Sequence, residues 1–390
     1  MAIPGPSVMP DRVLQAMHRP SPNIYAGALV DMTASIIPDL KAVAQTSQNV
    51  AMYISNGHGA WEAALSNTLS PGDKVLVLAT GRFAHGWASM ADYMGVTCVI
   101  EDFGKRDPID PNRVEELLRG DSGNEFKAVL AVQVDTSTSL KSDIAAIRAA
   151  MDAAGHPALL MVDCIACLGC DAFEMDAWGV DVMVAGCQKG LMTPPGMAFV
   201  FFSEKADAVR ETAGCVTHYW DWRPRARPEE YYQHFDGTAP THHLYGLREA
   251  LTMIVHEEGL EAVFARHATL ARAVWAAFET WGQEGPVELN VPDPAHRSNA
   301  VTSVRIGAPH GTALREWMEE VAGVTLGIGL GMAPPGDPAW HGFFRVGHMG
   351  HLNAQMVLGT LTSIEAGLDA LGVPHAPGGA AAAAKVVSGT

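Results

Sequence analysis

The fold is decided by the segment from Ala158 to Phe202, ALLMVDCIACLGCDAFEMDAWGVDVMVAGCQKGLMTPPGMAFVFF. Three apolar runs within it predict strands, at residues 158–162, 182–185 and 197–202. Continuous apolar runs of this length are typical of strands buried on both faces of a parallel sheet. Asp163 follows the first run and Lys189 follows the second. We therefore expect both side chains at the carboxyl edge of the sheet, where open α/β sheets bind ligands.

Asp163 and Lys189 together indicate a cofactor that needs both an acid and an amine. Pyridoxal phosphate requires an amine that forms an imine with its aldehyde and a carboxylate that keeps its ring nitrogen protonated. Asp163 ends an otherwise apolar strand, and a buried carboxylate needs a partner such as a pyridinium N–H. Position alone leaves the role of Lys189 open, because a lysine at a strand end is usually a solvated surface charge.

The bulk composition is that of an ordinary globular protein without a nucleic-acid signature. The 390 residues are 48% hydrophobic and 18% charged, and the formal net charge is -17. Binding to a nucleic-acid backbone needs a basic face instead. The sequence has neither a signal-peptide pattern nor an apolar run of about 18 residues, so we expect a cytoplasmic protein without a membrane span.

Three of the six cysteines form the pattern Cys164-x2-Cys167-x2-Cys170. Iron–sulfur proteins use this spacing, but the closely placed fourth ligand of the ferredoxin motif is missing. Six cysteines in a chain of this length also do not form a secreted disulfide framework. We therefore expect small, buried, reduced thiols and no bound metal.

The chain divides into two parts with distinct flanks. Residues 25–255 alternate strands with helices of about 10 to 15 residues, which predicts a large α/β domain with a mainly parallel sheet. Residues 256–373 show helices and weaker strand alternation, which predicts a smaller α+β domain. The Pro-rich residues 1–24 are expected to form an arm over the main body or a partner. The Pro/Gly/Ala-rich residues 374–390 are expected to form a flexible tail.

Further candidate site residues follow other predicted strands. The segment Asn56-Gly57-His58 lies between a predicted strand and a predicted helix, an arrangement that points backbone N–H groups at a phosphate. Phe83 or Trp87 is suited to stacking on an aromatic cofactor, although either is more often a core residue. Arg345 ends an apolar strand, where its guanidinium suits a carboxylate ligand or, alternatively, a structural salt bridge.

Seven short motifs, spread in order from Ile3 to the C-terminal helices, point to one family. They are IPGPS at 3–7, SNGH at 55–58, WEAAL at 61–65, LSPGD at 69–73, VDCIACLG at 162–169, GCQKGLMTPPG at 186–196 and FRVGHMG at 344–350. The Gln-Lys-Gly followed by Pro-Pro-Gly is the most specific of them. With these motifs the sequence resembles the class V aminotransferases of the alanine/serine/aspartate–glyoxylate group.

This resemblance implies the type I fold of pyridoxal 5'-phosphate enzymes, as in aspartate aminotransferase, with a mainly parallel seven-stranded sheet in the large domain. It implies that Lys189 forms the imine and that Asp163 pairs with the pyridine nitrogen, while Arg345 binds the substrate α-carboxylate. The other cofactor contacts that it implies are Asn56, Gly57, His58 and Gln188 at the phosphate, Thr136, Phe83 and Ile165 at the ring, and Thr238 from the neighbouring subunit of a homodimer.

The activity implied by the resemblance is a ping-pong transamination from a small amino acid to glyoxylate, which gives glycine and a 2-oxo acid. Aspartate, serine and alanine remain open as donors. The cationic residues of segment 217–243 favour aspartate, with a solvated or interface-facing loop as the alternative; they are Arg223, Arg225, Arg227, His242 and His243. A pyridoxamine–pyruvate-type transamination and a lyase or desulfurase reaction are the rivals. A desulfurase needs a catalytic cysteine in the C-terminal half, and none follows Cys215.

Overall fold

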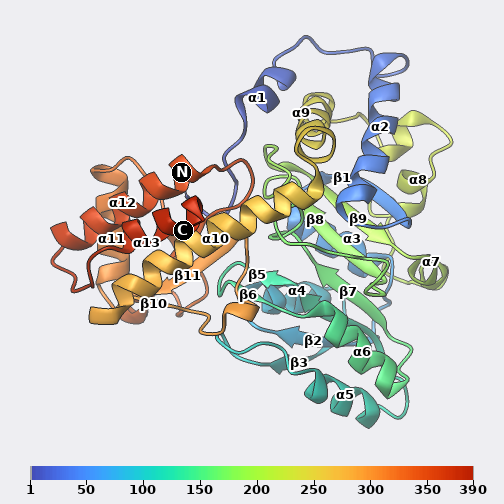
Figure 1. Cartoon of the computed structure of the whole chain (residues 1–390). Coiled ribbons are helices and arrows are strands. Elements are labelled where there is room, and N and C mark those ends of the chain that lie inside the picture. Colours follow the sequence, from blue (N-terminus) through green and yellow to red (C-terminus); the bar gives the residue numbers. More distant parts are fainter. Residues whose placement is uncertain (1, 390) are drawn as a thin grey trace.

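The larger part of the molecule is built on a seven-stranded sheet (Figure 1). In the computed structural model, which describes residues 2–389, the strand order is β1-β9-β8-β7-β4-β2-β3. The strands are β1 (Asn49–Ser55), β2 (Lys74–Ala79), β3 (Thr97–Asp102), β4 (Phe126–Val132), β7 (Leu159–Asp163), β8 (Val182–Gly186) and β9 (Gly196–Phe202). Only the pairings of β9, with β1 and β8, are antiparallel. The predicted mainly parallel seven-stranded sheet is confirmed.

The strands are apolar along their whole length because helices cover both faces of this sheet. Alternate residues of one strand enter different cores: Val200 and Phe202 pack on one face, whereas Phe199 and Phe201 pack on the other. One face is covered by α2 (Ala28–Val43), α5 (Pro111–Gly120), α6 (Ile144–Ala154) and α9 (Thr241–Leu251). The other is covered by α3 (Gly57–Ser66), α4 (Arg82–Tyr93), α7 (Glu204–Arg210) and α8 (Trp222–Ala226). Side chains at period 2 therefore meet apolar partners on both sides.

The C-terminal part has its own sheet and its own core. The antiparallel strand order is β10-β11-β13-β12, with β10 (Glu288–Leu289), β11 (Val301–Arg305), β12 (Gly327–Ile328) and β13 (Phe343–Gly347). Its helices are α10 (Leu260–Trp281), α11 (His310–Glu320), α12 (Ala354–Ala370) and α13 (Gly379–Ser388). Figure 1 shows α10, in yellow, running from the vicinity of α9 into this smaller part. None of the helices formed by residues 2–389 is long and apolar enough to cross a membrane.

The prediction of a flexible C-terminal tail is wrong over most of its length. Residues Gly379–Ser388 form α13, which packs against α10 and α12 and buries Ala383. The carboxylate of Glu365 accepts the N–H groups of Gly378 and Gly379, at 3.1 Å each. The run of five alanines explains the outcome, because alanine has the highest helix propensity and packs closely without losing side-chain entropy.

The N-terminal arm lies across the main body. Ala2 pairs with Leu326, and its carbonyl accepts the N–H of Gly347 at 2.7 Å. The Ser7 N–H then donates to the Gln188 carbonyl at 2.9 Å. After α1 (Asp11–Met17), which packs on α9, the chain enters α2. A two-stranded hairpin of β5 (Val134–Asp135) and β6 (Leu140–Lys141) completes the edge on which the predicted site residues lie.

Candidate active site

The carboxyl ends of β7 and β8 meet at a cavity of about 270 Å³ that gathers most of the predicted site residues. Its walls are Asn56, Gly57, His58, Trp61, Phe83, Val134, Thr136, Asp163, Ile165, Ala166, Gln188 and Lys189. Arg345 lies behind Thr136 and contacts the carbonyl of that residue. Thr238 is exposed on the loop after η1 (Tyr231–His234) and does not line the cavity. Its predicted contact with a neighbouring subunit stays a prediction.

Asp163 is a buried carboxylate held by two donors. Trp61 donates its indole N–H to Oδ2 at 2.8 Å, and the backbone N–H of Ile165 donates to Oδ1 at 2.7 Å. Burial raises the pKa of Asp163 to about 7, although these two hydrogen bonds oppose the shift. A carboxyl with such a pKa becomes fully ionised at neutral pH only when a cation approaches it.

Lys189 faces the same cavity from the loop after β8. Burial lowers the pKa of its ammonium to about 8, with a further contribution from the positive charge of Arg345. Its Nζ donates to the carbonyl of Pro4 in the N-terminal arm, and a Cβ added at Gly5 would lie 2.3 Å from Nζ. Ser7 Oγ donates to the Lys189 carbonyl at 2.7 Å. The arm therefore fixes the backbone and the amine of Lys189 from outside the sheet.

The N-terminus of α3 offers backbone N–H groups to the cavity. Asn56 is the helix cap, and its Oδ1 accepts the N–H groups of His58 at 3.0 Å and Gly59 at 3.3 Å. Oxygen acceptors of this kind satisfy the orphan donors and the positive end of the helix dipole, as an anion does. Gly57 packs closely on Ile165, because a Cβ there would lie 2.4 Å from Ile165 Cδ1 unless that side chain shifted.

Phe83 is placed by a second buried carboxylate, Asp135. Asp135 Oδ2 accepts the backbone N–H of Phe83 at 2.8 Å, and Oδ1 accepts the N–H and hydroxyl of Ser137 at 2.9 and 2.5 Å. Burial raises the pKa of Asp135. Trp87, the other stacking candidate, stacks on Trp61 with ring centroids 6.0 Å apart and lies in the core.

Arg345 extends from β13 toward the same edge. Its Nε donates to the Ile328 carbonyl at 2.7 Å and its Nη1 donates to the Thr136 carbonyl at 2.9 Å. Burial lowers the pKa of this guanidinium to about 10, while the negative charge of Asp135 raises it. Carbonyl acceptors orient the guanidinium without neutralising it, so Arg345 retains its charge for an anionic ligand.

Trp61, Asp135 and Pro4 belong to the site but were not identified as site residues from the sequence. Trp61 lies four residues after Gly57 in α3, a spacing that places both on one helix face. The sequence therefore held a signal for Trp61: its indole N–H needs a hydrogen-bond acceptor when it is buried, and Asp163 is a buried acid that needs a donor. Nothing local to the sequence brings Pro4 to Lys189, 185 residues away.

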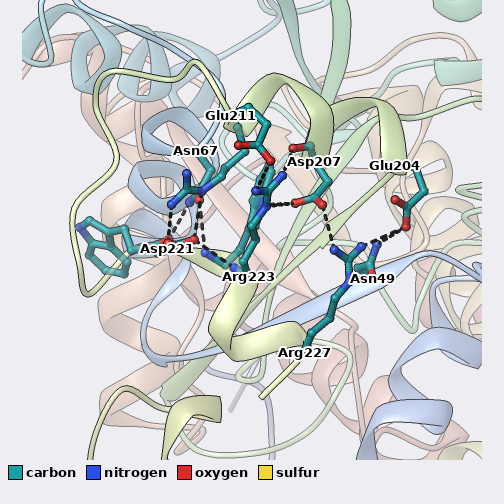
Figure 2. Close-up of polar contacts among 11 residues, drawn as sticks. Asn49, Asn67, Glu204, Asp207, Glu211, Asp221, Arg223 and Arg227 are labelled. Atoms are coloured by element: carbon teal, nitrogen blue, oxygen red, sulfur yellow. Dashed lines mark hydrogen bonds and ion pairs between the residues drawn. The ribbon is translucent and has the colours of Figure 1, made fainter. Parts of the chain in front are cut away.

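The cations of segment 217–243 are bound to the protein itself (Figure 2). Arg223 pairs with Asp207 at 2.9 Å and Glu211 at 2.5 Å, and Arg227 pairs with Asp207 at 3.0 Å and Glu204 at 3.1 Å. Arg225 is buried and donates to the carbonyls of Tyr219, Met52 and His234. His242 and His243 contact the carbonyls of Arg19 and Pro195. The richness of this segment in cations is therefore no evidence for an anionic substrate.

The cavity fits a pyridoxal phosphate molecule by the chemistry of its walls. Asp163 is a buried acid that forms no ion pair with residues 2–389, although the charge of Lys189 lowers its pKa, and Lys189 is a buried amine with a lowered pKa. Gln188 Oε1 is buried without a hydrogen-bond partner, and the α3 N-terminus lies opposite. A ligand with a basic ring nitrogen and an aldehyde would pair with Asp163 and Lys189, and the amide N–H2 of Gln188 and the α3 N-terminus would suit an anionic group of the same ligand. The three cysteines at Cys164, Cys167 and Cys170 are buried as predicted, and burial raises their pKa values.

Comparison with known proteins agrees with this geometry. The family model "Aminotransferase class-V" matches residues 4–346. A serine–glyoxylate aminotransferase of Methylorubrum extorquens is 37% identical, and an L-aspartate–glyoxylate aminotransferase of Paracoccus denitrificans is 38% identical. Each alignment covers 98% of this chain and 94% of the relative.

Solved structures give the same result for the fold. Pyridoxamine–pyruvate aminotransferase of Mesorhizobium loti superposes with a TM-score of 0.89 at 25% identity, covering 100% of this chain and 96% of that one. Ureidoglycine–glyoxylate aminotransferase of Bacillus subtilis superposes with a TM-score of 0.87 at 26% identity, covering 99% and 97%. The predicted type I fold is confirmed. This chain belongs to the class V aminotransferase family.

Proposed function

We propose that this aminotransferase uses pyridoxal 5'-phosphate to move an amino group from a small amino acid to glyoxylate, giving glycine and a 2-oxo acid. The observation that carries the proposal is the pair of Asp163 and Lys189, an acid and an amine that face one cavity from adjacent parallel strands. Two relatives, at 37% and 38% identity to this chain, are named as glyoxylate aminotransferases. These names supply glyoxylate as the acceptor in the proposal.

Bound pyridoxal phosphate would supply an aldehyde for the substrate amine and an electron-poor ring that accepts negative charge from the substrate Cα. Asp163 would keep the ring nitrogen protonated, which stabilises that charge. Lys189 would bind the cofactor and then serve as the general base, moving a proton from the substrate Cα. The pKa of about 8 suits this role, since the neutral amine is accessible near neutral pH.

The other walls would orient the two reactants. Phe83 and Ile165 would hold the ring from its two faces, with Thr136 at its edge. Asn56, Gly57, His58 and Gln188 would hold the phosphate. Arg345 would bind the α-carboxylate of the amino acid and of glyoxylate through its planar guanidinium.

A homodimer would complete the site, with Thr238 of one copy reaching the phosphate held by the other. In this chain Thr238 is exposed and outside the cavity, as such a role requires. We place the enzyme in the cytoplasm, with small amino acids and 2-oxo acids as its partners. Sedimentation of wild type and Thr238→Ala, with and without cofactor, tests the shared site.

The test of the function uses the protein loaded with pyridoxal phosphate. We expect a visible absorption band from the bound cofactor and glycine formation from glyoxylate with at least one of aspartate, serine and alanine. Lys189→Ala should lose the activity by roughly 10⁴-fold, because it lacks the base. Lys385→Ala, an exposed lysine of α13, is the matched control and should resemble wild type.

The rival reactions are separate arms of the same assay. Pyruvate consumption with free pyridoxamine, in place of an amino donor and glyoxylate, would establish the pyridoxamine–pyruvate reaction and overturn the proposal. Sulfide release from cysteine would do the same for a desulfurase. The absence of any cysteine after Cys215 argues against the second rival.

A further inference from the structure

A second cavity, of about 580 Å³, adjoins the first one. The two cavities share the side chains of His58, Trp61 and Phe83. The remaining walls come from the start of α4, the loop after β3 and the loop after β12; they are Gly81, Arg82, His85, Gly86, Asp102, Gly104, Lys105, Gly331, Ala333, Pro334 and Pro335. A ligand in the first cavity therefore has a wider space next to it, beyond His58, Trp61 and Phe83.

Arg82 is an unusual cation in this protein, because its guanidinium has no hydrogen bond or ion pair with any residue in the range 2–389. Most other arginines of that range have such partners, as those of segment 217–243 illustrate. Arg82 is exposed to solvent, and its side chain lines the second cavity beside His58. Its positive charge adds to burial in lowering the pKa of His58.

Arg82 and Arg345 contact adjacent residues of one turn, Ser137 and Thr136. The Arg82 N–H donates to Ser137 Oγ at 3.1 Å, while Arg345 Nη1 donates to the carbonyl of the preceding residue, Thr136, at 2.9 Å. The neighbouring Phe83 N–H is held by Asp135 at 2.8 Å. The backbone of Arg82 and the guanidinium of Arg345 are thus held by adjacent residues of one buried turn.

One loop of the smaller domain covers both arginines. The Ile328 carbonyl accepts from Arg345 Nε at 2.7 Å, and the Met332 carbonyl accepts from Lys105 Nζ at 3.1 Å. Between these residues, Gly331 has a φ of +72°, and a Cβ added there would lie 2.7 Å from Arg82 Cβ. Only glycine lets the loop approach the stem of Arg82 this closely.

The second cavity is arranged to take an anion. Its one carboxylate, Asp102, is already engaged by His85 at 3.0 Å and by the Gly104 N–H at 2.8 Å. Lys105 donates to the Met332 carbonyl, which is uncharged and does not neutralise the ammonium. Arg82 therefore faces a space with an excess of positive charge and presents a planar fork that matches a carboxylate.

We propose that Arg82 binds the side-chain carboxylate of a dicarboxylic amino donor, aspartate, while Arg345 binds its α-carboxylate. The inference rests on the proposed transamination and names the donor for it. Two cations whose residues contact one turn match the two carboxylates of a single substrate, and a neutral donor such as alanine would leave Arg82 without a partner. In the proposed function the α3 N-terminus and Gln188 would hold the cofactor phosphate, which leaves Arg82 for the substrate.

The test compares wild type with Arg82→Gln and Arg82→Lys, all loaded with pyridoxal phosphate. We expect Arg82→Gln to lower kcat/KM for aspartate by about 10- to 100-fold, the range for losing a charge-assisted hydrogen bond. With alanine and serine kcat/KM should change by less than about 3-fold. Arg82→Lys keeps the charge but loses the fork, so it should recover part of the aspartate activity. Arg227→Gln, a partly exposed arginine of segment 217–243, is the control.

A binding measurement complements the kinetics. Succinate, an unreactive dicarboxylate, should bind wild type, and its affinity for Arg82→Gln should be lower by about 10-fold or more. Propionate, which has a single carboxylate, should bind both proteins alike. The affinity for pyridoxal phosphate is measured in parallel and should be unchanged.

Four results would overturn the role of Arg82. These are equal losses for aspartate and alanine, an unchanged aspartate activity, a wild type that uses alanine but not aspartate, and a fall in cofactor affinity without a change in donor preference. The last result would assign Arg82 to the cofactor phosphate. A wild type that transfers no amine from any of the three donors would overturn the transamination itself, and the Arg82 role with it.

Discussion

Segment 217–243 and the sheet-edge site are both rich in charge, but they use it differently. In the segment, Arg223 and Arg227 meet carboxylates (Figure 2), and Arg225 donates to backbone carbonyls. At the sheet edge, Asp163 is buried without an ion pair and the Arg82 guanidinium has no partner among residues 2–389. Charge is therefore internally balanced in the first region and unbalanced in the second.

The difference teaches that the partners of charged residues, and not their number, indicate a ligand site. A buried polar group in a folded protein is normally satisfied by the protein or by water. Groups that burial leaves unbalanced, such as Asp163 and Gln188, have perturbed pKa values or lack hydrogen bonds, and such groups concentrate at functional sites. Removing a charge from the site should change chemistry, whereas removing one from the segment should change stability.

Among the arginine substitutions, the largest expected effect comes from Arg345→Gln. The guanidinium would hold the α-carboxylate with two charge-assisted hydrogen bonds, so its loss should lower kcat/KM by about 10³-fold. The loss should be similar for aspartate and alanine, because both donors carry the α-carboxylate. This is measured as initial rates with each donor at saturating glyoxylate.

Arg82→Gln supplies the contrast for Arg345→Gln, since it should discriminate between the same two donors. If Arg345→Gln reduced the activity with aspartate alone, Arg345 would be bound to the side-chain carboxylate and the assignment of the two arginines would be reversed. Circular dichroism before the assay establishes that the variant is folded.

The second prediction concerns Asp163 in protein stripped of cofactor. Its pKa is 3.8 when unperturbed and about 7 in the folded chain, so the folded state binds the proton more tightly. Stability from this group is therefore complete below about pH 4 and is lost as the pH rises to about 7. The shift corresponds to roughly 4 kcal/mol, as one pKa unit is about 1.4 kcal/mol.

Asp163→Asn cannot ionise and should escape this loss. The free energy of unfolding of wild type and Asp163→Asn is measured with urea at pH 5 and at pH 8. Between these two pH values wild type should lose stability relative to Asp163→Asn by a large part of the energy of the pKa shift. All other titrating groups are common to the two proteins. The same variant should bind pyridoxal phosphate more weakly, since a neutral amide cannot stabilise the protonated ring nitrogen. A difference in unfolding energy that does not depend on pH would contradict the raised pKa.

The sequence could predict the parts of this site that lie directly after strands. Asp163 and Lys189 follow apolar runs, and parallel strands bring their carboxyl ends to one edge, so β7 and β8 placed both residues correctly. The position of Asn56 to His58 at the cavity was predictable for the same reason. Family motifs supplied Phe83, Ile165 and Thr136, which line the cavity as expected.

What the sequence could not predict depends on contacts between distant segments. The pairing of Arg223 with Asp207 requires α7 and α8 to be neighbours, and the anchoring of Lys189 by Pro4 requires the arm to cross the sheet edge. The accessibility of Arg82 depends on where loop 328–332 lies. The helix α13 was missed because composition alone does not reveal the surface of α10 on which it packs.

The third prediction turns to segment 217–243. Arg225 is 1% exposed, donates to three carbonyls and lies 4.4 Å from the ring centroid of Tyr53. Arg225→Gln leaves buried acceptors unsatisfied, so the free energy of unfolding should fall by about 2 kcal/mol. Equilibrium urea unfolding measures the loss. The ratio of aspartate to alanine activity should be unchanged, and a selective fall with aspartate would restore the segment as part of the donor site.

The smallest effect is expected for Arg227→Gln. Arg227 pairs with Asp207 and Glu204, but its side chain is 48% exposed, and solvent screens such pairs. Asp207 also keeps its pairing with Arg223 in the variant. The free energy of unfolding should therefore fall by less than about 1 kcal/mol, and less still in high salt. Urea unfolding at low and high salt measures this loss of stability, and the ratio of aspartate to alanine activity is assayed in parallel.

A loss of stability larger than that for Arg225→Gln would mean that exposed ion pairs, and not buried carbonyl contacts, hold the segment in place. In that case the distinction between balanced and unbalanced charge would have to rest on the sheet-edge site alone.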